Sequence, residues 1–120
     1  MNELENHAVL NTADALDRIG NKSSLYLKIL EMFLINAPPI LANIESALMD
    51  GDCAQLTSLG HKLKGLAASI GAEQLVARCA VIQCFDQSAV NEGLRQDVDY
   101  LKSEYYLAED AVNRYLNHRT

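Results

Sequence analysis

The sequence contains no tryptophan, only two prolines and three cysteines among 120 residues. The two prolines are adjacent, at Pro38-Pro39, so most of the chain is free of the residue that interrupts helices most strongly. No segment keeps the alternation of polar and β-branched apolar residues that is typical of strands. These absences argue against a β-rich fold and predict an all-α protein.

The cysteines, Cys53, Cys79 and Cys84, are odd in number and form no C-x-x-C pair. They therefore predict no disulfide framework, and we expect unreactive thiols in a reducing cytoplasm. The first residues lack the charged start and apolar stretch of a secretion signal, and no apolar run approaches the length of a membrane span. We expect a cytoplasmic protein without a membrane-bound segment.

Basic residues are also scarce, with ten Lys and Arg against sixteen Asp and Glu and a net charge of -6. This balance argues against a nucleic-acid partner and favours a protein partner. The chain has neither a glycine-rich nucleotide loop nor the Glu-x-x-His pairs of a metal site inside a bundle. We expect no metal, no cofactor and no kinase activity of its own.

Apolar residues at helical spacing predict helices over residues 13–19, 24–36 and 38–50, and a last one over about 90–115 that is close to 40 Å long. A further helix begins at Asp52, and its apolar stripe is interrupted at Gly71 but continues to about Phe85. Short connections make neighbouring helices antiparallel. We predict a single domain over residues 1–120, with a core over about 12–116. Its fold is a monomeric, antiparallel up-and-down four-helix bundle with one or two short additional helices.

One histidine of this chain is predicted to face water in a clearing of small side chains. The helix that begins at Asp52 has one buried stripe, which places His61 on the opposite, exposed side. The stripe consists of Leu56, Leu59, Leu63, Leu66 and Ile70, and the residues near His61 are Ala54, Thr57, Ser58, Gly60, Lys64, Gly65 and Ala68. A lone exposed histidine is usually only a solvated side chain, but this combination favours a functional site.

A neutral imidazole can accept a phosphoryl group on a ring nitrogen. The Lys64 ammonium can offset the added negative charge. Each glycine inside a helix is about 1 kcal/mol less favourable than alanine, so Gly60 and Gly65 indicate a need for close approach. The sequence thus indicates a histidine that a phosphoryl donor approaches.

The residues from His61 to Ala72 resemble the H-x-x-K-G signature of histidine-containing phosphotransfer (HPt) domains, and the resemblance covers about residues 12–85. It implies that a response-regulator receiver domain passes a phosphoryl group to His61 and that another receiver collects it, in a relay with a hybrid sensor histidine kinase. It also implies that Lys64 stabilises the phosphoryl group, that Gly65 gives access, and that the receiver brings its own Mg²⁺. The chain departs from the family pattern at Gly60, where alanine is more usual, and at Leu66, where serine or alanine is.

Two functions other than phosphotransfer stay open, and so do two roles for the surface that contains Leu27 and Leu34. A helical adaptor that is never phosphorylated and a histidine-kinase dimerisation domain are the other functions, although Lys62 stands where such kinases usually carry an acid. Leu27 and Leu34 share a second face of the 24–36 helix, where they either dock a partner or lie under the 13–19 helix. Lys62 and Lys64 make the surface around His61 locally positive, which suits an acidic partner pocket.

Overall fold

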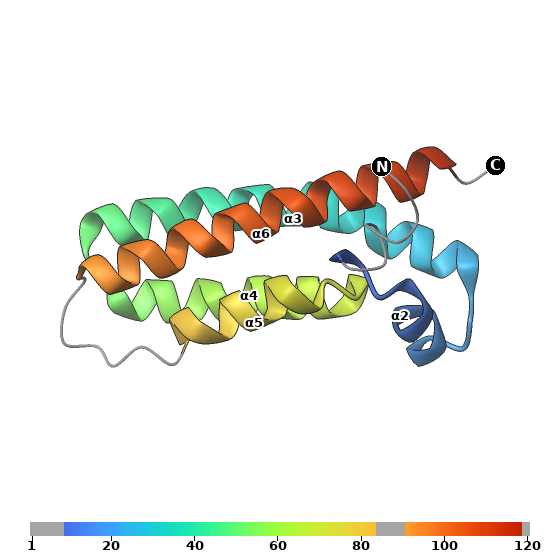
Figure 1. The fold of residues 1–120 in the computed structure, drawn as a ribbon, viewed down its shortest axis with the longest axis horizontal. Coiled ribbons are helices and arrows are strands. Elements are labelled where there is room, and N and C mark those ends of the chain that lie inside the picture. The colour runs from blue at the N-terminus through green and yellow to red at the C-terminus, as the bar shows by residue number, and fades with distance from the viewer. Residues whose placement is uncertain (1–8, 84–90, 119–120) are drawn as a thin grey trace.

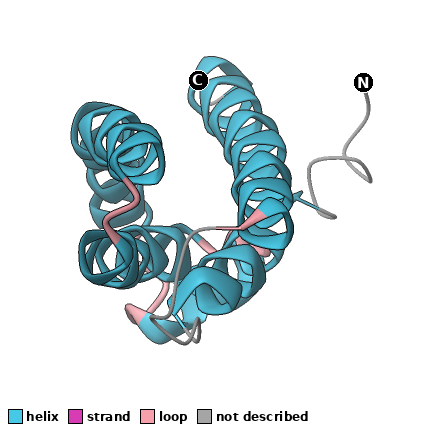
Figure 2. Cartoon of the chain, turned by 90° about the vertical axis from the view of Figure 1, so that its left-hand side faces the viewer, coloured by secondary structure: helices cyan, strands magenta, loops and turns pink. Residues whose placement is uncertain are grey.

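The computed structural model describes residues 9–83 and 91–118, and within these residues the chain is helical apart from the short segments that join the helices (Figures 1 and 2). In this part of the chain the structure has five helices and no strand. They are α2 (Thr12–Arg18), α3 (Ser23–Asp50), α4 (Cys53–Ile70), α5 (Glu73–Gln83) and α6 (Glu92–His118). The prediction of an all-α protein is confirmed.

The four longer helices lie side by side, and the short α2 covers one end (Figure 1). Helix α4 packs against both α3 and α5, and α6 packs against both α5 and α3. Consecutive long helices run in opposite directions in Figure 1, and Figure 2 shows them nearly end-on. Two residues join α3 to α4, and two join α4 to α5. Helix α2 contacts α3 and α4, so it lies at the end where α4 turns into α5.

The core is built from aliphatic and aromatic side chains at helical spacing. Tyr26, Phe33 and Tyr105 are among the largest buried side chains, and the rings of Phe33 and Tyr105 stack with centroids 5.8 Å apart. No charged or polar residue is buried within residues 9–82 and 91–118. The Tyr26 hydroxyl donates a hydrogen bond to the Ile70 carbonyl (2.8 Å), so its one polar group is satisfied inside the core.

The predicted break at the two prolines is wrong, because α3 runs without interruption for 28 residues with Pro38 and Pro39 inside it. A proline removes the hydrogen bond to the carbonyl four residues earlier and bends a helix. Figure 1 shows the N-terminal part of α3 inclined to the rest. Both prolines are exposed, whereas Ala37 and Leu41 on either side are buried. Burial of the same face before and after the prolines therefore holds the two halves in one helix.

The continuation through Gly71 is also corrected, because α4 ends at Ile70 and α5 is a separate helix. Gly71 has a left-handed backbone (φ 83°), and the Ala72 amide donates to the Ala67 carbonyl at 3.0 Å. This is the usual end of a helix at glycine, and it reverses the chain. The predicted apolar residues Leu75, Cys79 and Ile82 are buried, but on a helix that packs beside α4. The predicted end at Phe85 lies outside the described residues.

The remaining helix ends agree closely with the sequence prediction. Asn11 caps α2 by accepting from the Asp14 amide (3.1 Å), and Asp52 caps α4 by accepting from the Gln55 amide (3.1 Å). Helix α6 has 27 residues, which corresponds to about 40 Å. Helix α3 begins at Ser23, one residue before the predicted start, and the residue that precedes it, Lys22, makes no capping hydrogen bond through its side chain. Cys53 and Cys79 are buried and free, and Cys84 lies outside the described residues.

Helix α3 is long and apolar enough to cross a membrane by length and composition, with a mean hydropathy of 1.4 over an 18-residue window. This differs from the sequence expectation that no apolar run approaches that length. A mostly buried core helix of a soluble protein and a signal sequence near the N-terminus meet the same criterion, and 28% of this window is buried in the structure. Here the inner face of α3, including Leu30, Phe33 and Ile44, lies in the hydrophobic core.

Candidate functional site

His61 lies near the middle of α4, and its side chain is exposed, as the apolar spacing predicts. Leu59, Leu63 and Ile70 are buried on the opposite side of the helix. No hydrogen bond or ion pair joins the imidazole to another residue in the part of the chain that the structure describes. Both ring nitrogens therefore lack a protein partner among these residues and are open to a reactant.

Small or flexible side chains surround His61 on the surface of α4. Ala54, Ser58, Lys62 and Gly65 are exposed, and Thr57, Lys64 and Ala68 are half-buried. A Cβ atom added at Gly65 would have no heavy atom within 4 Å outside the local helix backbone, so the space one turn beyond His61 is open. The structure thus places every predicted neighbour of His61 on its face of the helix except one.

The exception is Gly60, which is buried and contributes nothing to the exposed clearing. It lies about 100° around the helix from His61, where α4 meets its neighbours. The predicted stripe is corrected at a second position, since Leu66 is only half-buried and Ala67 lies in the core instead. The open space beside His61 is therefore at Gly65 and not at Gly60.

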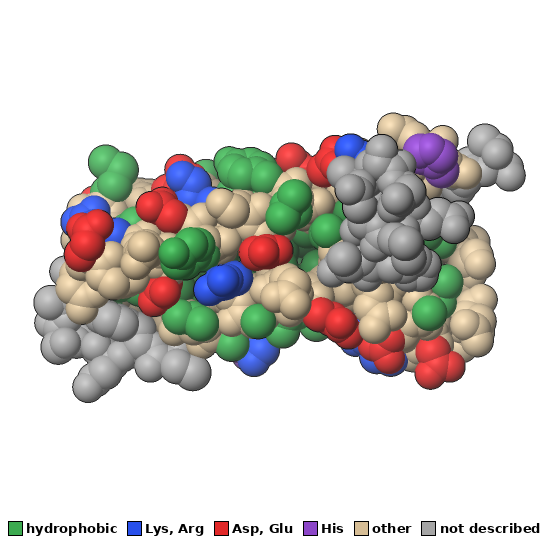
Figure 3. All heavy atoms as spheres, in the orientation of Figure 1, with side chains coloured by type: hydrophobic (Ala, Val, Ile, Leu, Met, Phe, Trp, Pro, Cys, Tyr) green, Lys and Arg blue, Asp and Glu red, His purple; other side chains and the backbone are tan. Residues whose placement is uncertain are grey.

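The charge on α4 is entirely positive. The helix has no acidic residue between Cys53 and Ile70. Neither Lys62 nor Lys64 forms an ion pair within residues 9–83 and 91–118. By contrast, the face formed by α5 and α6 carries acidic side chains spread among fewer basic ones (Figure 3). The protein is acidic as a whole, but the charged side chains of the helix with His61 are basic.

Lys64 extends from α4 toward α5. Burial raises the pKa of the Cys79 thiol to about 12, and the nearby Lys64 charge opposes that rise. Because Cys79 is on α5, the Lys64 charge acts across the contact between α4 and α5. Lys64 itself follows His61 by three residues, about one helical turn, and forms no ion pair with an acidic residue in the described part of the chain.

The two leucines predicted as a docking patch are not an exposed pair. Leu27 and Leu34 are both half-buried, and Leu34 packs against the core. The exposed apolar side chains in this part of α3 are Leu25, Met32 and Ile35, with 41%, 55% and 70% of their surface accessible. Helical periodicity alone predicts Leu25 and Met32 on the inner stripe with Phe33, and this prediction is wrong because both side chains are exposed.

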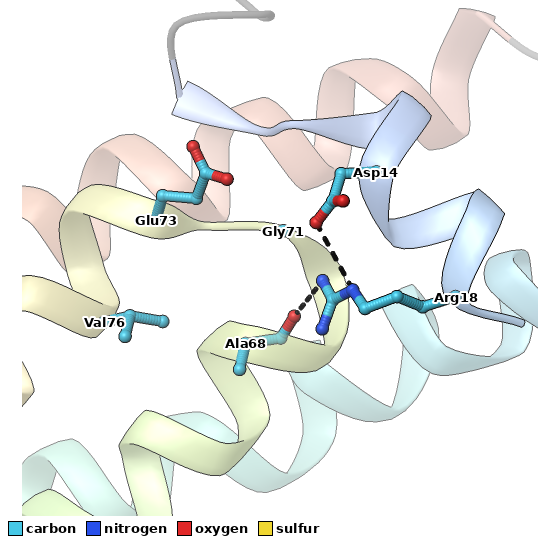
Figure 4. Close-up of a pocket in the computed structure, with 6 residues that line it drawn as sticks. All are labelled: Asp14, Arg18, Ala68, Gly71, Glu73 and Val76. Atoms are coloured by element: carbon cyan, nitrogen blue, oxygen red, sulfur yellow. Dashed lines mark hydrogen bonds and ion pairs between the residues drawn. The ribbon is translucent and has the colours of Figure 1, made fainter.

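Arg18 of α2 closes the C-terminal end of the His61 helix, a role that the sequence analysis missed (Figure 4). Its Nη2 atom donates to the Ala68 carbonyl at 2.8 Å, and its Nε atom pairs with Asp14 at 3.3 Å. The Asn11 amide donates to the Gly71 carbonyl at 2.8 Å in the same region. Fifty residues separate Arg18 from Ala68, so no local sequence signal could reveal this contact.

A recess of about 260 Å³ lies between α2 and the turn from α4 to α5. The residues that line it are Asp14, Arg18, Ala68, Gly71, Glu73 and Val76. Figure 4 shows Val76 pointing from α5 into this space and Arg18 reaching across it from α2. Elsewhere, His118 is exposed near the end of α6, and His7 lies outside the described residues. The described residues contain no group of three or more His, Cys, Asp or Glu that could hold a metal ion.

The model of the Hpt domain family matches residues 28–111, which includes α4 and its exposed histidine. The chain therefore belongs to the Hpt domain family. Domains of this family transfer phosphoryl groups through histidine in phosphorelays, where they work with receiver domains and histidine kinases and are carriers, not kinases. No curated protein and no solved structure gives a significant match to the chain.

Proposed function

We propose that His61 accepts a phosphoryl group from the aspartate of one response-regulator receiver domain and delivers it to another. The relay would begin at a hybrid sensor histidine kinase. One observation carries this proposal: within the segment matched by the family model, His61 is exposed on a helix with Lys64 and the open space at Gly65 one turn away.

The transfer requires a nucleophile, charge stabilisation and room for an in-line approach. A neutral ring nitrogen of His61 attacks the phosphorus of the aspartyl phosphate, so that an N–P bond forms. The P–O bond to the aspartate breaks, and its electron pair stays on the carboxylate that leaves. Lys64 stabilises the phosphoryl oxygens, the receiver supplies Mg²⁺, and the Hpt chain needs no cofactor. Transfer to the second receiver is the reverse of these steps.

The partner would dock on the exposed surface of α4. Ala54, Ser58 and Ala68 have short side chains that let another protein approach, and Thr57 borders them. Lys62 would attract the acidic phosphorylation pocket of a receiver, which increases the rate of encounter more than the final affinity. Of the α3 side chains, Leu34 serves the core more than docking, and Leu27 has only part of its surface available.

The packing of α3, α4, α5 and α6 supports an antiparallel up-and-down four-helix bundle, with α2 as the short additional helix. We propose that residues 1–120 form a single domain that acts as a monomer in the cytoplasm. Its partners are receiver domains, with no nucleic acid and no membrane. Protein docking, and not enzymatic turnover by this chain, then gives the relay its specificity.

Incubation with a phosphorylated receiver tests this function. The wild-type protein should gain acid-labile phosphate, and His61→Gln should gain none although it folds normally. His118→Gln is the matched control, because His118 is also exposed on a helix but lies far along the chain, and this variant should be labelled like the wild type. Lys64→Ala should be labelled more slowly. Acid-labile phosphate retained on His61→Gln, or none on the wild type, would contradict the proposal.

A further inference from the structure

We propose that the recess between α2 and the α4–α5 turn is a second contact for the same receiver domain and takes up an apolar side chain of that receiver. The inference rests on the proposed function and adds a residue, Val76, that selects among receivers. The recess is lined by α2, by the last turn of α4 and by α5 (Figure 4). A receiver would therefore be recognised there by residues that take no part in phosphoryl transfer.

The position of the recess relative to His61 carries the first part of the argument. Ala68, one of the residues that line it, follows His61 by seven residues, which is about 10.5 Å along the helix and about 20° around it. A standard protein interface covers about 800 Å² on each partner, which corresponds to a disc with a radius of about 16 Å. A receiver centred on His61 therefore covers the recess, and an unfilled recess under it would forfeit packing contacts.

The chemistry of the lining indicates what fills the recess. The Asp14 carboxylate pairs with Arg18, and the Glu73 carboxylate accepts from the Asn11 side-chain amide at 3.1 Å. The Ala68 carbonyl accepts from Arg18. The charged groups at the rim are thus already paired, and the Val76 side chain offers apolar surface. A neutral apolar side chain fits these walls without disrupting a hydrogen bond, whereas a charged one would have to displace a partner.

The walls of the recess are held in place, so it is formed before a partner arrives. Arg18 joins α2 to the end of α4, and the Asn11 amide joins the segment before α2 to Gly71. A Cβ atom at Gly71 would lie 2.6 Å from the Asn11 carbonyl oxygen, which shows how closely the two segments approach. A preformed recess avoids an ordering penalty on binding and favours partners of matching shape.

Val76→Ala tests the proposal, with Val81→Ala as the matched control on the same helix. Val81 is 43% exposed and does not line the recess. Removing the apolar surface of Val76 should raise the KM for the phosphorylated receiver about tenfold, with kcat nearly unchanged. Val81→Ala should keep the wild-type KM. Because Val76 also packs against the core, Val76→Thr provides a second variant that keeps the shape and makes the surface polar.

A small phosphodonor, phosphoramidate, separates docking from the chemistry at His61, because it has no surface that could enter the recess. Both Val76 variants should take phosphate from phosphoramidate at the wild-type rate. If their KM for the receiver equals that of the wild type, or if both donors are slowed equally, the recess is not a docking contact. If the wild type takes no phosphate on His61 from the receiver, the proposed function itself fails, which is a distinguishable result.

Discussion

Gly65→Ala should make the protein more stable and a poorer phosphoryl acceptor at the same time. An added Cβ atom meets no heavy atom within 4 Å beyond the local helix backbone, so the substitution creates no clash. Alanine is about 1 kcal/mol more favourable than glycine inside a helix, which for a domain of this size corresponds to a rise in Tm of about 4 °C. The methyl group would lie about 5–6 Å from the His61 Cβ atom, in the space through which a phosphoryl donor arrives.

The rate of transfer from a phosphorylated receiver should fall about tenfold in Gly65→Ala and about a hundredfold in Gly65→Gln, because small displacements of reacting groups slow a reaction by such factors. Thermal unfolding measures the first effect, and the time course of labelling measures the second. Gly93→Ala, in α6, is the control and should keep the wild-type rate. A lower Tm in Gly65→Ala would refute the open space at this position, and an unchanged rate in both Gly65 variants would refute the access role.

Two predictions concern stability. Gly71→Ala should lower the free energy of unfolding by about 3 kcal/mol or more, and Gly20→Ala by only about 1 kcal/mol. Both glycines have a positive φ, but only at Gly71 would the added Cβ atom meet the backbone, 2.6 Å from the Asn11 carbonyl oxygen. Equal losses in urea denaturation would show that the contact with Asn11 does not matter. Burial raises the pKa of Cys79 from 9.0 to about 12, so the folded state holds this proton more tightly than the unfolded state. The contribution of Cys79 to the free energy of unfolding should therefore be fully present below about pH 9 and fall above it by up to about 1.4 kcal/mol per pH unit. The free energy of unfolding of Cys79→Ala should fall less steeply with pH. Identical slopes for the two proteins would contradict this prediction.

The helical fold could be predicted because apolar spacing is a local signal. The caps Asn11 and Asp52 and the long α6 all follow from short stretches of sequence. The continuity of α3 through Pro38 could not be predicted, because local propensity favours a break at proline. Burial of Ala37 and Leu41 in the tertiary structure overrides that propensity. Periodicity also could not show that the chain reverses after Ile70, since the apolar stripe of α5 continues the pattern of α4.

The exposure of His61 was predictable for the same reason, since the phase of one helix decides it. The burial of Gly60 follows from the same phase, because Gly60 stands four residues after Leu56 and three before Leu63 on the buried side of the helix. The prediction was wrong there because it placed Gly60 in the clearing for being next to His61 in the sequence. Arg18 and the recess beside Ala68 were missed because they depend on how α2 docks on a helix 50 residues away. Such contacts arise from the tertiary packing of segments whose sequences show no pattern in common.

The most direct test of the central claim is to locate the phosphoryl group on the wild-type protein after incubation with a phosphorylated receiver. Tryptic cleavage after Lys28 and Lys62 gives a peptide of residues 29–62 in which His61 is the only histidine. Mass spectrometry under conditions that preserve phosphohistidine should find the added phosphoryl group on this peptide. It should disappear when an unphosphorylated receiver is added. A phosphoryl group on any other peptide, or none on this one, would contradict the assignment of His61 as the carrier.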